Sequence, residues 1–462
     1  MSLQIFNTLS AKKEEFKPQN PPEIRMYTCG PTVYDFAHIG NFRTYVFQDL
    51  LCRYLAFKGF QVKRVMNITD VDDKTIAGAI REKLTLDEFT QKYTDEFHKD
   101  LKILNILPPF QELYATKTIP EMVDLIKQLI QKNNAYEKDG SVYFRISSFP
   151  KYGALSKKNL EGNIVGARVD QDEYEKEVGS DFALWKRAKE GEPSWDSPWG
   201  KGRPGWHIEC SAMGLHAFGG KTLDIHTGGE DLIFPHHENE IAQSECATGH
   251  KFAVYWIHAK HLLVDGEKMS KSKGNFFTLR DLIKKGFDPI AIRYLLMSGH
   301  YRSQLNFTFD GLNAAKETLL RIQHFWRDLN HEYKQVQNST GLKLHIDNAK
   351  KDVIAAMDDD LNVPAALAAI FELIKKANIS QQVSLQEKEE VKNFLELMDQ
   401  IFGVFSLKQD VPTDVQDLAK ARQEAKEKKD FKKADEIRNQ IKSLGFIITD
   451  TSGGVTIITP NK

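Results

Sequence analysis

A strand, a polar loop, a long helix and a second strand are predicted in this order near the start of the chain. Residues 25–29 are predicted to form a short strand that Gly30 and Pro31 end, and residues 44–57 carry the apolar spacing of a helix that Gly59 would end. Residues 61–67 then alternate in the manner of a strand. This order is typical of a βαβ unit, in which ligands bind beyond the carboxyl ends of parallel strands. The chain is therefore predicted to be an α/β protein with a Rossmann-type parallel sheet.

The sheet is predicted to be interrupted by an insertion. The chain has 462 residues, which is too many for one core and indicates two to four domains. Residues 109–204 combine helix, short strands and a segment rich in Gly, Pro and Trp, and strand-like runs resume at 223–226 and 255–258. We interpret residues 109–204 as an insertion between two halves of the sheet.

The last third of the chain is predicted to be mainly helical. Residues 309–408 carry helical spacing typical of an α-helical bundle. Residues 416–462 form a small α+β module that begins with a single helix over 416–444 and ends in apolar runs. Residues 419–442 hold nine Lys or Arg against five Asp or Glu. This segment either meets nucleic-acid phosphates or forms a solvated helix face.

Composition limits where the protein acts and what it binds. The formal net charge is −1, so any surface for nucleic acid must be a local patch. The first residues lack the features of a secretory signal, and no apolar run is long enough to cross a membrane. The four cysteines lie far apart, as in a cytosolic chain without disulfides. We therefore expect a cytoplasmic protein, and the lack of a long exposed heptad favours a monomer.

Four side chains could form a metal site. His236 and Glu240 lie four residues apart, so on a helix they share one face. Cys29 and Cys210 are the cysteines that stand next to other motif residues. Two thiols, an imidazole and a carboxylate suit Zn²⁺. The alternative is a pair of unrelated core thiols with a surface His/Glu pair.

Two short segments suggest that the chain handles nucleotides. The first, here called the HIGN segment, is predicted to lie at a helix N-terminus, where free amides favour phosphate, and consists of His38, Ile39, Gly40 and Asn41. The second, here called the lysine loop, consists of Lys268, Met269, Ser270, Lys271 and Ser272. Its lysines could neutralise charge that develops on a leaving pyrophosphate. The alternative for this loop is a solvated basic surface.

The sequence does not decide whether several histidines are site residues or structural groups. His226 follows a strand-like run and could line the site. The others are either site residues or satisfied structural groups: His207, His237, His258 and His261.

Taken together, these motifs resemble those of the cysteinyl-tRNA synthetase family, which belongs to the class I aminoacyl-tRNA synthetases. The resemblance covers nearly the whole chain and is most specific in residues 27–35, 67–74, 191–213 and 234–240. The HIGN segment is similar to the class I HIGH signature, and the lysine loop is similar to the KMSKS signature. The second His of HIGH is Asn41 here, which still offers a neutral hydrogen-bond donor.

The resemblance implies a division into domains. Residues 1–108 and 205–308 correspond to the catalytic domain, with the zinc site and the lysine loop, and residues 109–204 to the connective insertion. Residues 309–408 correspond to the helical anticodon-binding bundle, and residues 416–462 to a small module that contacts tRNA.

The resemblance also implies the activity. L-Cysteine would react with ATP to give cysteinyl-adenylate and pyrophosphate, and the cysteinyl group would pass to tRNA(Cys). One Zn²⁺ per chain, held by Cys29, Cys210, His236 and Glu240, would select the thiolate over serine, and Mg²⁺ would arrive with ATP.

Site roles follow from the same resemblance. Lys268, Lys271, His38 and Asn41 are the expected catalytic residues. His38, Gly40 and Asn41 of the HIGN segment and all five residues of the lysine loop would bind ATP. Candidates for the rest of the amino-acid pocket are Trp206, Asp231, Thr69 and His226. Trp206 could instead be a packing residue.

Two other functions fit part of the sequence. A cysteine ligase could use a small amino-sugar acceptor instead of tRNA, but the roughly 150 residues after residue 309 would then lack a purpose. A noncatalytic, zinc-stabilised RNA-binding protein is the second, and the lysines of the loop argue against it.

Overall fold

The computed structural model describes residues 2–157, 181–407, 413–450 and 456–460. The chain forms two compact units. The first comprises residues 1–313 and 356–364, and the second comprises residues 314–355 and 365–462.

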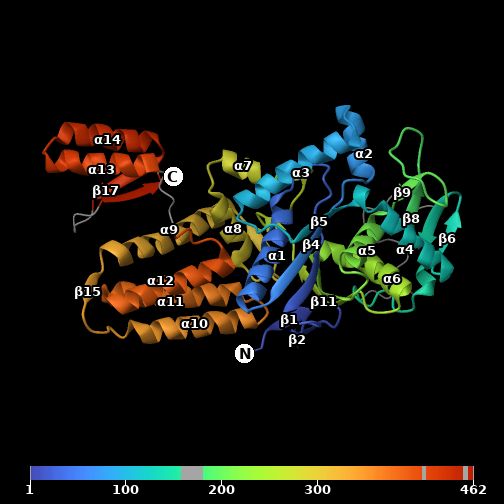
Figure 1. Cartoon of the computed structure of the whole chain (residues 1–462), viewed down its shortest axis with the longest axis horizontal. Coiled ribbons are helices and arrows are strands. Elements are labelled where there is room, and N and C mark those ends of the chain that lie inside the picture. The colour runs from blue at the N-terminus through green and yellow to red at the C-terminus, as the bar shows by residue number, and fades with distance from the viewer. Residues whose placement is uncertain (1, 158–180, 408–412, 451–455, 461–462) are drawn as a thin grey trace. The chain divides into compact units, whose positions relative to one another are not determined.

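A five-stranded parallel sheet lies at the centre of the first unit (Figure 1). Its order is β11-β10-β3-β4-β5, and each neighbouring pair runs parallel. The strands are β3 (Glu23–Thr28), β4 (Gln61–Ile68), β5 (Gln111–Tyr114), β10 (Leu223–Gly229) and β11 (Ala253–Ala259). The predicted parallel α/β sheet is thereby confirmed.

Helices cover both faces of this sheet. Helix α1 (Ile39–Phe57) connects β3 to β4, whereas α6 (Glu238–Thr248) connects β10 to β11 in the opposite direction along the sheet. Because such connections are right-handed, the two helices lie on opposite faces. Figure 1 shows α1 on one side of the strands and α5 (Trp206–Ala217) with α6 on the other. The adjacent ends of β3 and β10 are therefore a topological switch point, where α/β sheets bind ligands.

The strand–helix boundary after β3 differs from the prediction. The helix was predicted over 44–57, but it begins at Ile39. The reason is a reciprocal cap: the His38 side chain accepts a hydrogen bond from the Asn41 backbone N–H, and the Asn41 side chain accepts one from the His38 backbone N–H. The HIGN segment thus forms the first turn of α1.

A four-stranded antiparallel sheet lies between β5 and α5 in the chain, whereas β5, which also falls in the predicted insertion over 109–204, belongs to the parallel sheet. The order of the antiparallel sheet is β6-β7-β8-β9, formed by β6 (Ala135–Lys138), β7 (Ser141–Phe144), β8 (Phe182–Arg187) and β9 (Gly202–Pro204). Trp185 of β8 is fully buried and belongs to the same apolar cluster as Ile208 and Met213 of α5. Helix α4 (Ile119–Gln131) packs against α5 and α6.

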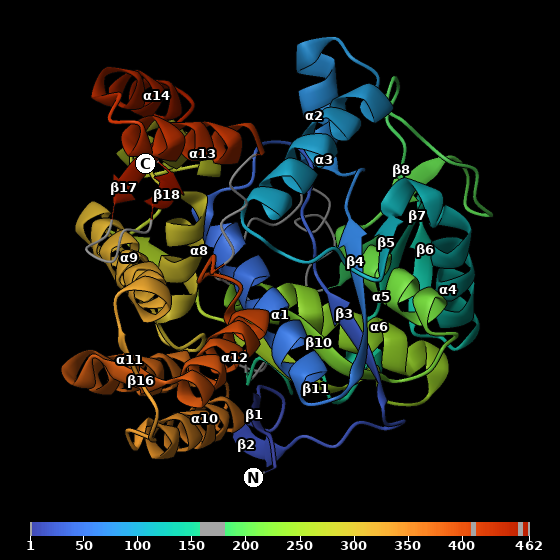
Figure 2. The ribbon, with the colours of Figure 1, turned by 60° about the vertical axis from the view of Figure 1, so that its left-hand side comes forward.

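The remaining elements of the first unit surround the sheets (Figure 2). They are β1 (Gln4–Asn7), β2 (Lys12–Glu15), α2 (Asp73–Glu82), α3 (Leu86–Ile103), β12 (Leu262–Val264), β13 (Glu267–Lys268), α7 (Leu279–Lys284), α8 (Pro289–Ser298) and β14 (Leu305–Phe307).

The second unit is mainly helical, as predicted. Its long helices are α9 (Phe309–His331), α10 (Leu342–Asp358), α11 (Val363–Ser380) and α12 (Leu385–Phe402), and β15 (Lys334–Val336) pairs with β16 (Gln382–Ser384). The last elements are α13 (Thr413–Glu427), α14 (Phe431–Ser443), β17 (Phe446–Asp450) and β18 (Thr456–Pro460), and Figure 1 shows α13 and α14 side by side.

The prediction of a single helix over 416–444 was wrong. The chain forms two helices, α13 and α14, because it turns at residues 428–430. Lys429 adopts a left-handed conformation with φ 60°, and Asp430 caps α14 by accepting a hydrogen bond from the Lys433 backbone N–H. The continuous polar composition of this stretch hid the turn.

Candidate active site

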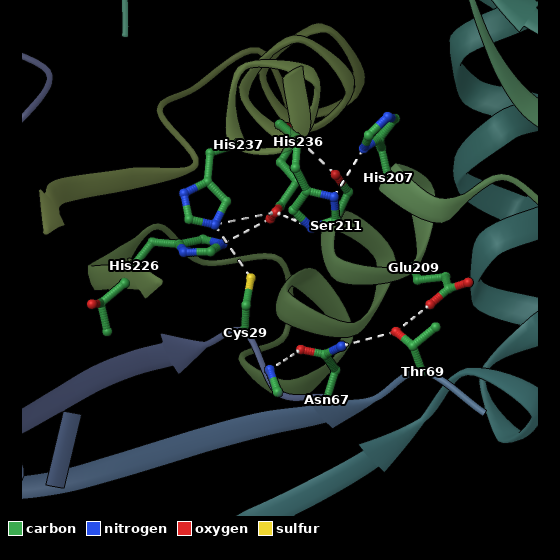
Figure 3. A network of polar contacts seen from close by, with 12 residues as sticks. Cys29, Asn67, Thr69, His207, Glu209, Ser211, His226, His236 and His237 are labelled. Carbon is green, nitrogen blue, oxygen red and sulfur yellow. Dashed lines mark hydrogen bonds and ion pairs between the residues drawn. The ribbon is translucent and has the colours of Figure 1, made fainter. Parts of the chain in front are cut away.

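Four predicted metal ligands come together between the ends of β3 and β10. Cys29 directly follows β3, Cys210 lies in α5, and Glu240 lies in the first turn of α6. His236 lies in the short helical turn Ile233–His237 that precedes α6, and Figure 3 shows its ring near Cys29 and His237. One donor atom from each residue lies within 4.8 Å of the others, and all four side chains are buried. These four residues are called the donor cluster below.

The charges within the donor cluster suit a cation. A hydrogen bond with Cys29 lowers the pKa of the Cys210 thiol to about 6 despite its burial. Burial by itself raises the pKa of Glu240, but His226 and His236 lower it to about 2. The Glu240 Oε1 atom lies 3.0 Å from His236 Nε2 but makes no hydrogen bond. A buried thiolate and carboxylate with an unsatisfied oxygen fit the donor set of a divalent metal ion.

A second set of donors overlaps the first. Cys29, His226, His237 and Glu240 also bring one donor atom each within 4.8 Å of the others. His226 Nε2 lies 2.7 Å from Glu240 Oε2, and His237 Nε2 lies 3.3 Å from Cys29 Sγ. His226, expected to line the amino-acid pocket, is fully buried behind Glu240 and stacks on Trp256 with 4.5 Å between ring centroids.

Three of the four undecided histidines belong to the same polar network. His237 Nδ1 lies 2.7 Å from His258 Nε2, and His258 Nδ1 lies 2.8 Å from Thr8 Oγ1. Burial lowers the pKa of His258 to about 3, so this ring is neutral at pH 7. His207 Nδ1 lies 2.9 Å from His236 Nδ1, which leaves His236 Nε2 directed to the cluster. The fourth histidine, His261, pairs instead with Glu230.

Thr69 lies in a buried chain of hydrogen bonds beside the donor cluster (Figure 3). Its hydroxyl donates to Glu209 Oε2 at 2.8 Å and accepts from Asn67 Nδ2 at 3.2 Å. Asn67 Oδ1 in turn accepts the Gly30 backbone N–H at 2.9 Å. Gly30 has no room for a side chain, because an added Cβ would collide with the Asn67 carbonyl oxygen. This chain fixes the backbone that follows Cys29.

Trp206 and Asp231 lie at the exposed side of the cluster. The Trp206 ring is 36% exposed, and its centroid lies 4.3 Å from that of His236. Burial, Cys210 and Glu240 raise the pKa of the Cys29 thiol, and the exposed Asp231 carboxylate lies close enough to add a smaller increase. An aromatic face and a carboxylate beside the cluster could bind a cationic group such as an ammonium.

The HIGN segment contacts the lysine loop. An added Cβ at Gly40 would lie 3.0 Å from the His38 ring and 3.1 Å from Met269 Cε. His38 Nδ1 accepts from the Asn41 backbone N–H, so the proton of a neutral His38 ring is on Nε2. Burial lowers the pKa of His38 to about 4, which keeps the ring neutral at pH 7. His38 thus offers a donor rather than a charge.

Lys268, Lys271 and Ser272 of the lysine loop are exposed, whereas Met269 and Ser270 are half-buried. Lys271 Nζ lies 2.5 Å from Asp35 Oδ2 and 5.1 Å from the centre of the Phe276 ring. The bond to Asp35 raises the pKa of Lys271. Ser270 donates its N–H to Asn275 Oδ1 at 2.8 Å, and its hydroxyl lies 2.7 Å from that of Ser272. Lys268, at the end of β13, is exposed.

Sequence reasoning did not single out Asp35 or Glu209. Asp35 lies within the family-like run 27–35 and Glu209 within 191–213, so the motifs contained both residues. Their contacts join residues that are distant in sequence: Asp35 pairs with Lys271, and Glu209 with Thr69.

None of the helices in the described residues is long and apolar enough to cross a membrane.

Comparisons with known proteins agree with this geometry. Residues 15–317 match the family model of the class I (C) tRNA synthetase catalytic domain. Residues 352–408 match the DALR domain, and residues 408–457 match the cysteinyl-tRNA ligase anticodon binding domain. The fold and the first match define the class: this chain carries a class I aminoacyl-tRNA synthetase catalytic domain.

Relatives define the family within that class. The chain is 48% identical to the cysteine–tRNA ligase of Protochlamydia amoebophila, over 98% of this chain and 97% of the relative. It is 49% identical to that of Solibacter usitatus, over 98% and 99%. The chain therefore belongs to the cysteine–tRNA ligase family, as the resemblance in its motifs implied.

Solved structures of more distant proteins share the fold. A LeuRS–tRNA–LeuAMS ternary complex from Agrobacterium radiobacter K84 matches with a TM-score of 0.62 and 12% identity, over 85% of each chain. Mycobacterium tuberculosis methionyl-tRNA synthetase with methionyl-adenylate matches with a TM-score of 0.59 and 13% identity, over 83% of this chain and 90% of that one. These likenesses support the class I fold.

Proposed function

We propose that this protein is a cysteine–tRNA ligase that works in two steps. The carboxylate of L-cysteine attacks the α-phosphate of ATP, and pyrophosphate leaves with the bonding electron pair. The terminal ribose hydroxyl of tRNA(Cys) then attacks the adenylate carbonyl, and AMP leaves. The proposal is supported by a buried cluster of two Cys, one His and one Glu donor, by the contact between the HIGN segment and the lysine loop, and by membership of this family.

The donor cluster would hold one Zn²⁺ per chain through Cys29, Cys210, His236 and Glu240. Bound there, zinc would supply a preference for a soft thiolate over a hydroxyl group. Shape alone separates cysteine from serine by only about 1–3 kcal/mol, because the two differ by one atom. Around the cluster, the His207 contact fixes the orientation of the His236 ring. Trp206 and Asp231 would enclose the ammonium group of the substrate.

The HIGN segment and the lysine loop would bind ATP and stabilise the transition state. The α1 N-terminus offers backbone N–H groups to phosphate, and His38 adds an Nε2–H donor. Asn41 holds His38 in place through the reciprocal cap. Lys268 and Lys271 would neutralise the charge that develops on pyrophosphate. Mg²⁺ would accompany ATP through phosphate oxygens.

The helical unit favours tRNA, rather than a small molecule, as the acceptor of the cysteinyl group. Residues 408–457 match an anticodon binding domain, and the described basic side chains of α14 are exposed. A small amino-sugar acceptor would not require this part of the chain. The protein would therefore act where tRNA is charged, in the cytoplasm.

Cysteine-dependent ATP–pyrophosphate exchange tests the first step, with serine as competitor and zinc measured on the same sample. We expect exchange with cysteine only, at about one zinc per chain. Charging of tRNA(Cys) in a second assay tests the acceptor. A zinc-loaded, folded protein that shows no exchange would overturn the proposal, and exchange without tRNA charging would favour the small-acceptor ligase.

A further inference from the structure

The base of the lysine loop is closed by contacts of its own. Strand β13 pairs with β12, so Lys268 lies opposite Leu263 at the start of the loop. The Asn275 side chain, just beyond the end of the loop, accepts the Ser270 backbone N–H at 2.8 Å and donates to the Lys268 carbonyl at 3.3 Å. These contacts shape the loop, but they do not set its place relative to the HIGN segment.

The segment that follows the lysine loop is bonded to the HIGN segment. The Ile39 backbone N–H donates to the Phe277 carbonyl at 3.0 Å. The rings of Phe276 and His38 meet edge to face, with 5.1 Å between their centroids. Lys271 Nζ lies 5.1 Å from the centre of the same Phe276 ring. A shift of Phe276 would therefore move the surface on which Lys271 lies.

Arg280 ties this segment to helix α3. It lies in the first turn of α7, two residues after the capping residue Thr278. Its Nη1 donates to Asp100 Oδ2 at 2.8 Å, and its Nη2 bonds the Glu96 carboxylate and the Glu96 carbonyl. The Asp100 side chain is buried, and that of Arg280 is 24% exposed. The planar guanidinium can bind these acceptors together in one geometry, which a lysine cannot do.

Arg280 also contacts the loop that carries Asp35. Its guanidinium carbon lies 4.4 Å from the centre of the Phe36 ring, in a cation–π contact. The Phe36 ring packs edge to face against Tyr93 of α3, with 5.3 Å between centroids. Asp35 directly precedes Phe36 and pairs with Lys271. Arg280 therefore fixes the backbone next to the residue that holds Lys271.

The contacts of Arg280 suit a fixed support better than a phosphate ligand. Among the described residues, its guanidinium meets α3 and Phe36, and two carboxylates already compensate its charge. Removing Arg280 would take a charge partner from the buried Asp100 and loosen the segment after the lysine loop. The support would be lost on both sides of Lys271 at once.

We propose that Arg280 is a positioning residue that acts through Lys271, by fixing the Phe276 and Asp35 sides of that lysine for the release of pyrophosphate. The proposal rests on the proposed function, because it assumes that Lys271 neutralises charge on pyrophosphate. Misplacing a group that acts on the transition state lowers kcat and leaves ground-state binding of the amino acid unchanged.

The test is a double-mutant cycle of Arg280→Ala and Lys271→Ala in the full-length, zinc-loaded protein, followed by cysteine-dependent ATP–pyrophosphate exchange. We expect Arg280→Ala by itself to lower kcat about tenfold, with zinc content and KM for cysteine unchanged. In the Lys271→Ala background the same substitution should lower kcat less than about threefold, because the group through which Arg280 acts is already absent.

Two further variants support the cycle. Arg280→Lys keeps the charge but loses the fork of donors, so its kcat should fall between those of the wild type and Arg280→Ala. Lys284→Ala is the matched control and should equal the wild type, because Lys284 is an exposed basic residue at the end of the same helix. Thermal unfolding checks that each variant is folded. If Arg280→Ala does not fold, the cycle is run with Arg280→Lys.

An equal factor of loss in the two backgrounds would mean that Arg280 supports the structure independently of Lys271, and would overturn the proposal. Loss of zinc from the Arg280 variants, or an unchanged kcat in both of them, would also overturn it. If the wild type performs no exchange, the proposed function fails and the positioning role fails with it. If the wild type performs exchange and Lys271→Ala lowers kcat but Arg280→Ala does not, only the positioning role is rejected.

Discussion

The donor cluster and the lysine loop lie in the same unit but are built differently. The Cys210 and Glu240 side chains are buried, and each has neighbours on several sides. The Lys271 side chain is 64% exposed and is held by one ion pair with Asp35. A buried site can discriminate between similar atoms because its geometry does not have to rearrange. The exposed Lys271 must separate from Asp35 before it can bind phosphate. Such a side chain suits a step in which negative charge develops on a leaving group.

A substitution in the donor cluster is expected to reduce activity more than one in the lysine loop. Cys210→Ser replaces a soft sulfur donor with a hard hydroxyl oxygen that does not ionise near pH 7. We expect loss of bound zinc and a fall in cysteine-dependent exchange of about a thousandfold or more. Metal analysis and exchange on the same sample check this. Cys246→Ser is the matched control, since that thiol lies outside both donor sets. Full zinc content together with normal exchange in Cys210→Ser would show that the donor cluster is not needed for cysteine activation.

The next largest effect is expected in the lysine loop. Lys271→Ala should lower kcat for exchange by about a hundredfold, with little change in KM for cysteine, because its charge acts mainly on the transition state. Zinc content should stay at the wild-type level. Lys273→Ala is the control, since Lys273 directly follows the lysine loop and pairs with Glu267, which directly precedes it. An unchanged kcat would assign the loop to the solvated surface that the sequence left open.

A smaller effect is expected where the HIGN segment meets the lysine loop. Gly40→Ala adds a methyl group about 3 Å from both the His38 ring and Met269, so these groups must shift by a few tenths of an ångström. We expect KM for ATP to rise about tenfold, with zinc and cysteine affinity unchanged. Steady-state kinetics with ATP varied provides the measurement. Gly266→Ala, in the nearby turn with φ 79°, controls for general backbone strain.

The smallest effect is expected for the ion pair that holds Lys271. Asp35→Asn should raise kcat/KM for ATP by less than about fivefold, because exposed ion pairs contribute little and the freed lysine reaches phosphate more readily. Exchange kinetics at low and at high salt check this, since screening should reduce the difference between variant and wild type. A large loss of activity would instead mean that Asp35 binds substrate or Mg²⁺ directly.

The parallel sheet could be predicted from sequence because βαβ units have a strong local pattern. The strands at 61–67, 223–226 and 255–258 were located correctly, and the structure extends each by one to three residues. The start of α1 was placed five residues late because apolar spacing does not reveal a reciprocal cap between His38 and Asn41. The break at 428–430 was missed because a turn made by Lys429 and Asp430 resembles any polar helix surface.

The residue types of the donor cluster could be predicted from the sequence itself, because only a few kinds of side chain bind metal ions. The sequence motifs predict Cys29, Cys210, His236 and Glu240 as metal ligands, and the fold brings their donor atoms together. Only the tertiary structure decided which groups surround them. The contacts of His237 with Cys29, of Asp35 with Lys271 and of Asp100 with Arg280 join residues that are 180 to 236 positions apart. Local sequence patterns carry no record of such pairs, because packing of the whole unit brings them together.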